Sequence, residues 1–221
     1  MKLRSWRYFY PAQPRRLWED SQLLEEICSG DDYVAEIKKN GWQWNLVRFP
    51  DGRYEAWTRH GTRSTLKVDS YVKELNTLPW KGLCEVQIEV LDRRTTDVKH
   101  KLFFFDVKIW DGELLKGETF TERRRILEGM FDRIPGKYNW FTLGHQKAGT
   151  LQLSMIFDSQ VGFRDLFKAN CNDPMSEGLV FKKRDGRLEV SPSGEMDSVC
   201  MFKWKRVEEH MKTGGGGVAN G

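Results

Sequence analysis

The chain has 221 residues and a mass of 26.0 kDa, and its 36 basic and 32 acidic side chains give a formal net charge of +4. Hydrophobic residues make up 39% of the sequence and aromatic residues 13%, which is more apolar material than a disordered chain carries. The composition therefore excludes disorder and predicts a packed core in one large domain.

Segments that would indicate a membrane or secreted protein are not found in the sequence. The longest purely apolar run, Leu102–Phe105, is far shorter than the roughly 20 residues that cross a bilayer. The basic start, Met1–Arg7, is not followed by the apolar stretch of a secretory signal. The scattered cysteines and histidines lack the spacing of a structural zinc site or a disulfide scaffold. We therefore expect a cytoplasmic protein with reduced thiols.

The first third of the chain begins with a helical pattern and continues with strand-like ones. The segment Arg16–Cys28 has apolar residues at helical intervals, at Leu17, Leu24 and Ile27, which predicts a short amphipathic helix. Strands are predicted at Tyr33–Ile37, Trp42–Phe49 and Tyr54–Thr58. A Pro-Asp-Gly turn at 50–52 joins the last two, so an antiparallel meander is expected.

The remaining patterns mix helices and strands. Helices are predicted at Ser70–Asn76, Thr121–Phe131 and Val161–Asn170. Strands are predicted at Gly82–Leu91, Lys101–Trp110, Leu179–Lys183, Arg187–Val190 and Ser198–Trp204. Thr121 is expected to cap its helix, with Arg123–Arg125 on the solvent side. The order of elements indicates an α+β fold, with antiparallel sheets flanked by helices.

The domain organisation is expected to be simple. Residues 1–212 form one domain, and Thr213–Gly221, with four consecutive glycines, is expected to be a flexible tail. Basic clusters interleaved with aromatic residues recur along the domain, at Lys38-Lys39, Arg123–Arg125, Lys182–Arg184 and Lys203–Arg206. Such clusters are typical of a groove that follows a phosphate backbone, and equally of an ordinary solvated surface.

Three lysine-containing motifs indicate chemistry. Lys38 stands at the end of a predicted strand, directly before the Asn40-Gly41 turn. The segment Glu177–Lys182 opens an apolar strand with an acid and a glycine and ends it with a lysine. In the last strand, alternation puts Lys203 and Lys205 on one face. Two neighbouring ammonium groups on one face favour an anionic ligand.

In this order the motifs resemble those of the covalent nucleotidyltransferases, the superfamily of ATP-dependent DNA ligases, RNA ligases and mRNA capping enzymes. The Lys-x-Asp/Asn-Gly motif of that superfamily is matched by Lys38–Gly41, its Glu-Gly-x-Val-x-Lys motif by Glu177–Lys182 and its Lys-x-Lys motif by Lys203–Lys205. The resemblance spans roughly residues 33–206. It implies a nucleotidyltransferase, or adenylation, domain of a minimal phage-type ligase in the host cytoplasm. An OB-fold domain, which usually follows, cannot be built from the 16 residues after Lys205.

The resemblance also implies a role for each matching residue. Lys38 would be the nucleophile that attacks the α-phosphate of ATP. Lys203 and Lys205 would favour its neutral form and cradle the phosphate. The nucleotide-binding residues implied by the resemblance are Glu36 at the adenine amino group, Arg59 in a short arginine motif, Glu85 at the ribose, Phe105 stacking on the base, Glu177 at metal or ribose, and Lys182.

The acidic residues are also the expected metal ligands. Glu177 and Glu85 would bind Mg²⁺, or Mn²⁺. Glu89 is an alternative to Glu85, because the Asp-Gly that usually precedes this acid is replaced by Leu83-Cys84.

The expected function is that of an ATP-dependent polynucleotide ligase that acts as a monomer. It would form lysyl-AMP, adenylate a 5′-phosphate and seal nicks in duplex DNA or RNA/DNA hybrids. Gln43 stands where the DNA and RNA branches differ and matches neither. The alternatives are an RNA ligase proper, a capping-type guanylyltransferase and a non-catalytic nucleic-acid-binding module.

Overall fold

The structure is a computed structural model that describes residues 3, 5–64, 68–91, 100–132, 150–170 and 172–206. The tail expected at 213–221 lies outside these residues. Within them, no helix is long and apolar enough to cross a membrane.

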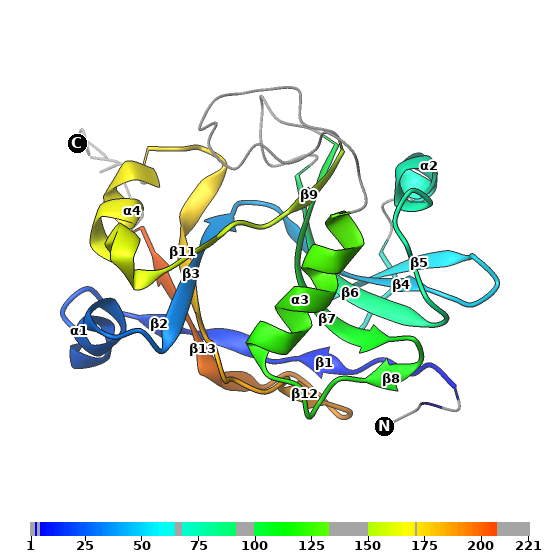
Figure 1. The fold of residues 1–221 in the computed structure, drawn as a ribbon, viewed down its shortest axis with the longest axis horizontal. Coiled ribbons are helices and arrows are strands. Elements are labelled where there is room, and N and C mark those ends of the chain that lie inside the picture. The colour runs from blue at the N-terminus through cyan, green and yellow to red at the C-terminus, as the bar shows by residue number, and fades with distance from the viewer. Residues whose placement is uncertain are drawn as a thin grey trace, which may run out of the picture.

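Two sheets form the framework of the described chain (Figure 1). The six-stranded sheet has the order β5-β4-β6-β7-β8, with β9 also paired to β7. Its strands are β4 (Trp42–Arg48), β5 (Tyr54–Thr58), β6 (Cys84–Leu91), β7 (Lys101–Trp110), β8 (Glu113–Leu114) and β9 (Leu151–Leu153). All its pairs are antiparallel except β7 with β9.

The five-stranded sheet has the order β10-β3-β11-β13-β2. Its strands are β2 (Gln13–Leu17), β3 (Tyr33–Lys39), β10 (Ile156–Phe157), β11 (Ser176–Lys183) and β13 (Asp197–Lys205). The edge strand β2 runs parallel to β13, and the other pairs are antiparallel. A short antiparallel pair, β1 (Tyr10–Pro11) with β12 (Val190–Ser191), completes the strands of the described residues.

Short helices cover the sheets (Figure 1). They are α1 (Gln22–Ser29), α2 (Val72–Leu75), α3 (Phe120–Phe131) and α4 (Phe163–Asn170), with 3₁₀ turns η1 (Val68–Tyr71) and η2 (Ser159–Val161). Leu24 and Ile27 of α1 and Phe163 of α4 pack on one face of the five-stranded sheet, against Phe181 and Trp204. That face is a hydrophobic core, so the polar residues of the same strands lie on the other face.

A second hydrophobic core lies on the six-stranded sheet. Leu46, Ile88 and Phe104 come from its central strands, and Leu127 and Phe131 come from α3. Each sheet therefore has its own core, and the α+β class with antiparallel sheets flanked by helices is confirmed.

The first predicted helix was placed too early. Arg16 and Leu17 belong to strand β2, and the helix begins only at Gln22 because Ser21 is its N-cap. The Ser21 hydroxyl accepts a hydrogen bond from the backbone N–H of Leu24 at 3.3 Å. Leu17 is buried by pairing with β13 instead of by a helix face.

The helix after β8 also starts earlier than predicted. Thr119, not Thr121, is the N-cap of α3, and it forms a capping box with Glu122. Downstream, α4 begins at Phe163 because Gly162 has a φ of +75°, and the strand predicted at Arg187–Val190 is only the short β12.

Candidate active site

Strand alternation places a row of charged residues on the polar face of the five-stranded sheet. In the register of β3, β11 and β13, Lys38 lies opposite Gly178, which in turn lies opposite Lys205. One step along, Glu36 lies opposite Val180, which lies opposite Lys203. Paired residues share a face, so we call the set Glu36, Lys38, Lys182, Lys203 and Lys205 the lysine face.

A single carboxylate joins two of these lysines. Oε2 of Glu177 accepts from the Lys38 Nζ at 2.6 Å and lies 2.9 Å from the Lys205 Nζ. The three side chains are only partly exposed, at 23%, 21% and 35% for Lys38, Glu177 and Lys205. Burial would raise the pKa of the Glu177 carboxyl, but the two lysines outweigh it and hold the pKa below its ordinary value.

Glu177 reaches this position because β11 is irregular there. The register between β11 and β3 shifts between Ser176 and Gly178, which leaves Glu177 outside the simple alternation. Gly178 has a φ of +134°, and a Cβ at this position would stand 2.0 Å from the carbonyl oxygen of Trp204. Only glycine therefore allows β13 to approach so closely.

The turn after Lys38 is held against the six-stranded sheet. The Asn40 N–H donates to the Met175 carbonyl at 2.8 Å, and the Gly41 N–H donates to Oε1 of Glu89 at 2.9 Å. A Cβ on Gly41 would lie 2.6 Å from the Val90 carbonyl oxygen. The Asn-Gly turn thus places the end of β3 against β6.

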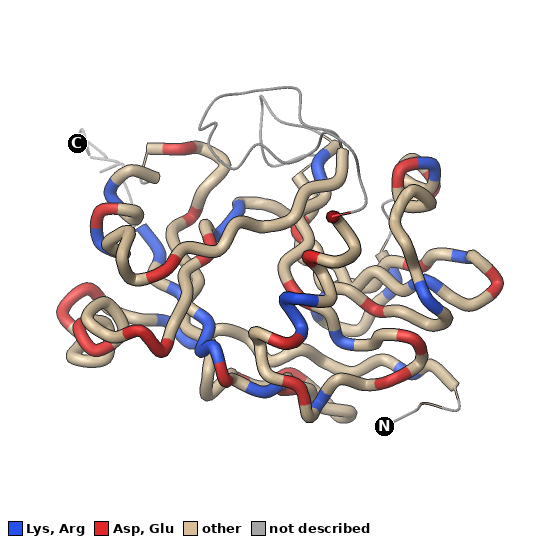
Figure 2. Tube along the Cα trace, viewed as in Figure 1, with Lys and Arg blue, Asp and Glu red and all other residues tan. Residues whose placement is uncertain are grey.

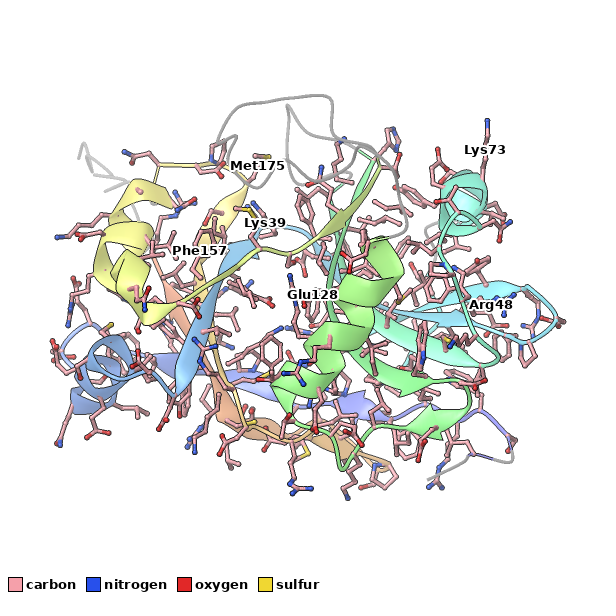
Figure 3. All side chains as sticks on the ribbon, in the orientation of Figure 1. Lys39, Arg48, Lys73, Glu128, Phe157 and Met175 are labelled. Atoms are coloured by element: carbon pink, nitrogen blue, oxygen red, sulfur yellow. The ribbon has the colours of Figure 1, made fainter. Side chains whose placement is uncertain are left out.

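The neighbouring Lys39 ties the same strand end to β7. Its Nζ stands 5.1 Å from the centre of the Phe103 ring, and Figure 3 shows it at the end of β3. Burial lowers the pKa of Lys39.

A second group on the lysine face contacts β7. The Lys182 Nζ donates to Oε1 of Glu36 at 3.0 Å and to the carbonyl of Phe105 at 2.9 Å. It also stands 5.0 Å from the centre of the Phe105 ring and 4.9 Å from that of Phe120. Burial raises the pKa of the Glu36 carboxyl, although the positive charges of Lys182 and Arg124 act against it. The structure therefore brings Glu36, Lys182 and Phe105 together.

Two of the three helix arginines expected on the surface are buried, so that expectation was wrong. Arg123 makes a bidentate ion pair with Asp106, at 2.8 and 3.0 Å, next to Phe105. Arg124 donates to Glu128 at 2.9 Å and to the Ser154 carbonyl at 2.6 Å. Only Arg125 is exposed, because α3 packs against β7 along the side that carries the first two.

The remaining lysine, Lys203, lies near three other cations and one carboxylate, Asp197. Burial lowers its pKa, and the charges of Lys205, Lys38 and Arg59 lower it further. Arg59 itself is exposed on the turn after β5, where its Nε lies 3.1 Å from Nε2 of His60.

The expected ribose acid, Glu85, is placed differently from the other residues. Its side chain is fully buried on β6 and pairs with Lys108, whose Nζ also donates to the Phe9 carbonyl. Its second oxygen accepts from Nε1 of Trp6 at 3.0 Å. Both oxygens of Glu85 are therefore engaged, and its rival Glu89 is engaged by Gly41.

Lys108 was missed by the sequence analysis. Burial lowers its pKa, against the opposing effect of Glu85. A lysine inside the predicted strand Lys101–Trp110, near an acid in the preceding strand, was the signal that could have indicated this buried pair.

The acidic residues suit a metal ion only in part. No group of three or more His, Cys, Asp or Glu side chains among the described residues could hold a metal by itself. Mg²⁺ is usually held by one or two carboxylates together with substrate phosphates. Glu177, at the junction of the lysines, fits such a role. Glu85 does not fit it while Lys108 and Trp6 occupy its oxygens.

No protein-family model matches the sequence, and no curated protein matches it. Solved structures do. The ligase domain from M. tuberculosis LigD is 19% identical with a TM-score of 0.54, over 78% of this chain and 53% of that one. A mycobacterial DNA ligase D complexed with ATP and MES is 18% identical with a TM-score of 0.57, over 89% of this chain and 60% of that one. The ATP-dependent DNA ligase from bacteriophage T7, in complex with ATP, is 12% identical with a TM-score of 0.50, over 90% of this chain and 69% of that one.

These identities are low, and the chain spans only 53% and 60% of the length of the first two structures. The similarity therefore shows a shared fold, while the arrangement of side chains described above is a property of this chain.

Proposed function

We propose that this chain, which has the fold of ATP-dependent ligase adenylation domains, is an ATP-dependent polynucleotide ligase that acts as a monomer. Lys38 forms a covalent bond to AMP, the AMP passes to a 5′-phosphate, and a 3′-hydroxyl displaces it to seal the strand. The observation that carries this proposal is the contact of Lys38 and Lys205 with one carboxylate, Glu177, beside Lys203 on the same face.

The first step needs Lys38 as a neutral amine. Its Nζ attacks the α-phosphorus, an N–P bond forms, the bond to the β-phosphate oxygen breaks, and pyrophosphate leaves. In the present arrangement the Lys38 Nζ is paired with the Glu177 carboxylate at 2.6 Å. When Glu177 engages another cation, this ion pair weakens, and repulsion from Lys203 and Lys205 then favours loss of the Lys38 proton.

The same cations stabilise the transition state. Negative charge builds on the α-phosphate oxygens, and Lys203 and Lys205 lie on the face from which Lys38 attacks. Mg²⁺ held by Glu177 would supply further positive charge to the phosphates. Glu85 would join this site only after releasing Lys108 and Trp6.

The base would lie near the second group of the lysine face. Glu36 can accept a hydrogen bond from the adenine amino group, and Phe105 offers its ring for stacking. Lys182 holds both, through the Glu36 carboxylate and the Phe105 carbonyl. Arg59 would approach the phosphates from the turn after β5.

The proposed substrate is a nick in duplex DNA, or in an RNA/DNA hybrid. Two of the solved structures cited above are named as DNA ligases in complex with ATP, which is consistent with DNA as the substrate and ATP as the nucleotide. Sealing assays on DNA, RNA and hybrid nicks would test the strand preference.

Labelling with α-³²P-ATP followed by denaturing electrophoresis tests the proposal. We expect a labelled band with ATP and not with GTP. Lys38→Arg keeps a positive charge beside Glu177 but carries a guanidinium that does not deprotonate, so it should give no band. Lys183→Ala is the matched control, because the Nζ of Lys183 pairs with Asp185 at 3.5 Å. It should label like the wild type.

Labelling by GTP would instead indicate a capping-type guanylyltransferase. No labelling by either nucleotide would indicate a non-catalytic module. A band that survives in Lys38→Arg would refute Lys38 as the nucleophile.

A further inference from the structure

The edge strand of the five-stranded sheet places an arginine beside the lysine face. Strand β2 runs parallel to β13, with Arg16 opposite Lys203 and Arg15 opposite Phe202. Arg16 therefore lies on the same face as Lys203, while Arg15 lies on the opposite face, where its guanidinium stands 4.8 Å from the Phe202 ring centre. Both arginines are exposed.

An exposed tryptophan follows the same strand. Trp18 is 58% exposed, and the guanidinium of Arg16 stands 4.2 Å from the centre of its ring. The backbone at Trp18 is held where α1 begins, because its carbonyl accepts from the Ser21 N–H at 3.1 Å and from the Ser21 hydroxyl at 2.8 Å. Trp18 is thus an exposed indole on a fixed backbone.

The chemistry of this surface fits a polynucleotide strand. Figure 2 shows Lys and Arg positions gathered where β2 and β13 run side by side. Proteins that bind single strands combine a cationic track along the phosphates with exposed aromatic rings on which bases stack. Arg16 and Lys203 supply the cations here, and Trp18 supplies the ring.

We propose that Arg16, Lys203 and Trp18 form a strand-binding surface, on which phosphates contact the two cations and a base stacks on the indole. The surface continues the lysine face outward from Lys38, so it is placed to hold a strand that reaches the site. This inference rests on the proposed ligase function and assigns a binding role to the segment before α1.

Fluorescence anisotropy without ATP tests the surface, with a labelled, 5′-phosphorylated single strand and with a nicked DNA duplex that contains it, because stacking on Trp18 needs an unpaired base. Arg16→Ala should weaken binding several-fold and reduce the slope of log affinity against log salt by about 1. Trp18→Ala should weaken binding roughly tenfold with little change in slope. Arg15→Ala removes the same charge one residue away on the other face, and it should bind like the wild type.

AMP-adduct formation and thermal unfolding are measured on the same four proteins. Adduct formation should be equal in all of them, because the surface acts after adenylation. Equal weakening by Arg15→Ala and Arg16→Ala, or no binding by the wild type, would overturn the proposal. Slower adduct formation with unchanged nick binding in Arg16→Ala would also overturn it and would assign Arg16 to the triphosphate.

The two proposals can fail separately. If the wild type forms no adduct but Arg16→Ala and Trp18→Ala still weaken nick binding selectively, the ligase function fails while the surface stands.

Discussion

At the scale of single residues, the Glu177 carboxylate balances part of the positive charge of the site. One carboxylate oxygen contacts two lysines, and the third lysine, Lys203, lies beside them in the field of Lys205, Lys38 and Arg59. The same carboxylate compensates the repulsion among the lysines. The site can therefore respond to any ligand that competes for Glu177.

Glu177→Gln should make stability less dependent on acid pH. The folded-state pKa of Glu177 lies below its ordinary value, so its ion pairs stabilise the fold above about pH 4.3, the ordinary pKa of Glu. This contribution is lost as the pH falls through the lower folded-state pKa. For such partly exposed pairs we expect the variant to lose about 1 kcal/mol at pH 7 and nothing at pH 2.5.

Urea denaturation at the two pH values measures this difference. An equal loss of unfolding free energy at both would show that Glu177 acts through packing rather than through its charge.

Lys203→Met should increase stability while reducing activity. Burial and neighbouring cations lower the pKa of Lys203, so its charge opposes folding at neutral pH, below both the folded and the unfolded pKa. Removing the charge should stabilise the protein by a few tenths to about 1 kcal/mol, less at high salt. Adduct formation should fall about 10²- to 10³-fold, as for other lost transition-state contacts.

Single-turnover labelling and thermal melts at low and high salt check both parts. Unchanged labelling would remove Lys203 from the site, and a lower melting temperature would contradict the repulsion.

At the scale of elements, the irregular strand β11 positions Glu177 within the site. The bulge before Gly178 turns Glu177 toward Lys38 and Lys205, and the missing Cβ at Gly178 lets β13 approach. A regular strand would put Glu177 on the hydrophobic face with Leu179 and Phe181.

Gly178→Ala should therefore be strongly destabilising. The new Cβ would meet the Trp204 carbonyl oxygen, and φ is +134°, so we expect a loss of more than about 2 kcal/mol. Gly129→Ala is the contrasting variant, since Gly129 lies within α3 and, apart from its chain neighbours and the α3 backbone, no atom of the described residues lies within 4 Å of its Cβ position. It should stabilise by up to about 1 kcal/mol.

Denaturant titration of the two variants measures both effects. A Gly178→Ala protein as stable as the wild type would show that β13 can shift without cost.

Elements with a regular pattern could be predicted from the sequence, and those set by distant pairing could not. Alternation in β13 correctly separated Lys203 and Lys205 from Phe202 and Trp204. Leu17 fitted a helical spacing, yet it is buried by a parallel strand nearly 190 residues away. Likewise, Arg123 is buried because Asp106 of β7 pairs with it, which the helix sequence alone does not indicate.

At the scale of the whole molecule, Lys182 connects the two sheets. It belongs to β11 of the five-stranded sheet, and it bonds both Glu36 of β3 and the Phe105 carbonyl of β7 in the six-stranded sheet. Glu36, Phe105 and Lys182 come from three separate sequence motifs, and the fold brings them into contact. The contact of Glu85 with Trp6 could not be predicted, because it depends on where the N-terminal segment crosses β6.

Lys182→Met should leave the buried Glu36 without its partner. We expect a loss of about 3–5 kcal/mol, and the already raised pKa of Glu36 should rise further. Glu36→Gln should cost less, because Lys182 keeps the Phe105 carbonyl and the two aromatic rings. The double variant should recover much of the loss.

A double-mutant cycle by urea denaturation measures the coupling. Additive losses would show that Glu36 and Lys182 do not depend on each other.

Bonding of AMP to the Lys38 Nζ can be tested by mass spectrometry of the protein after incubation with ATP and Mg²⁺. We expect one added AMP per chain, located on the peptide that contains Lys38 after digestion. An adduct on another residue, or an unmodified protein under conditions in which its fold is intact, would contradict it.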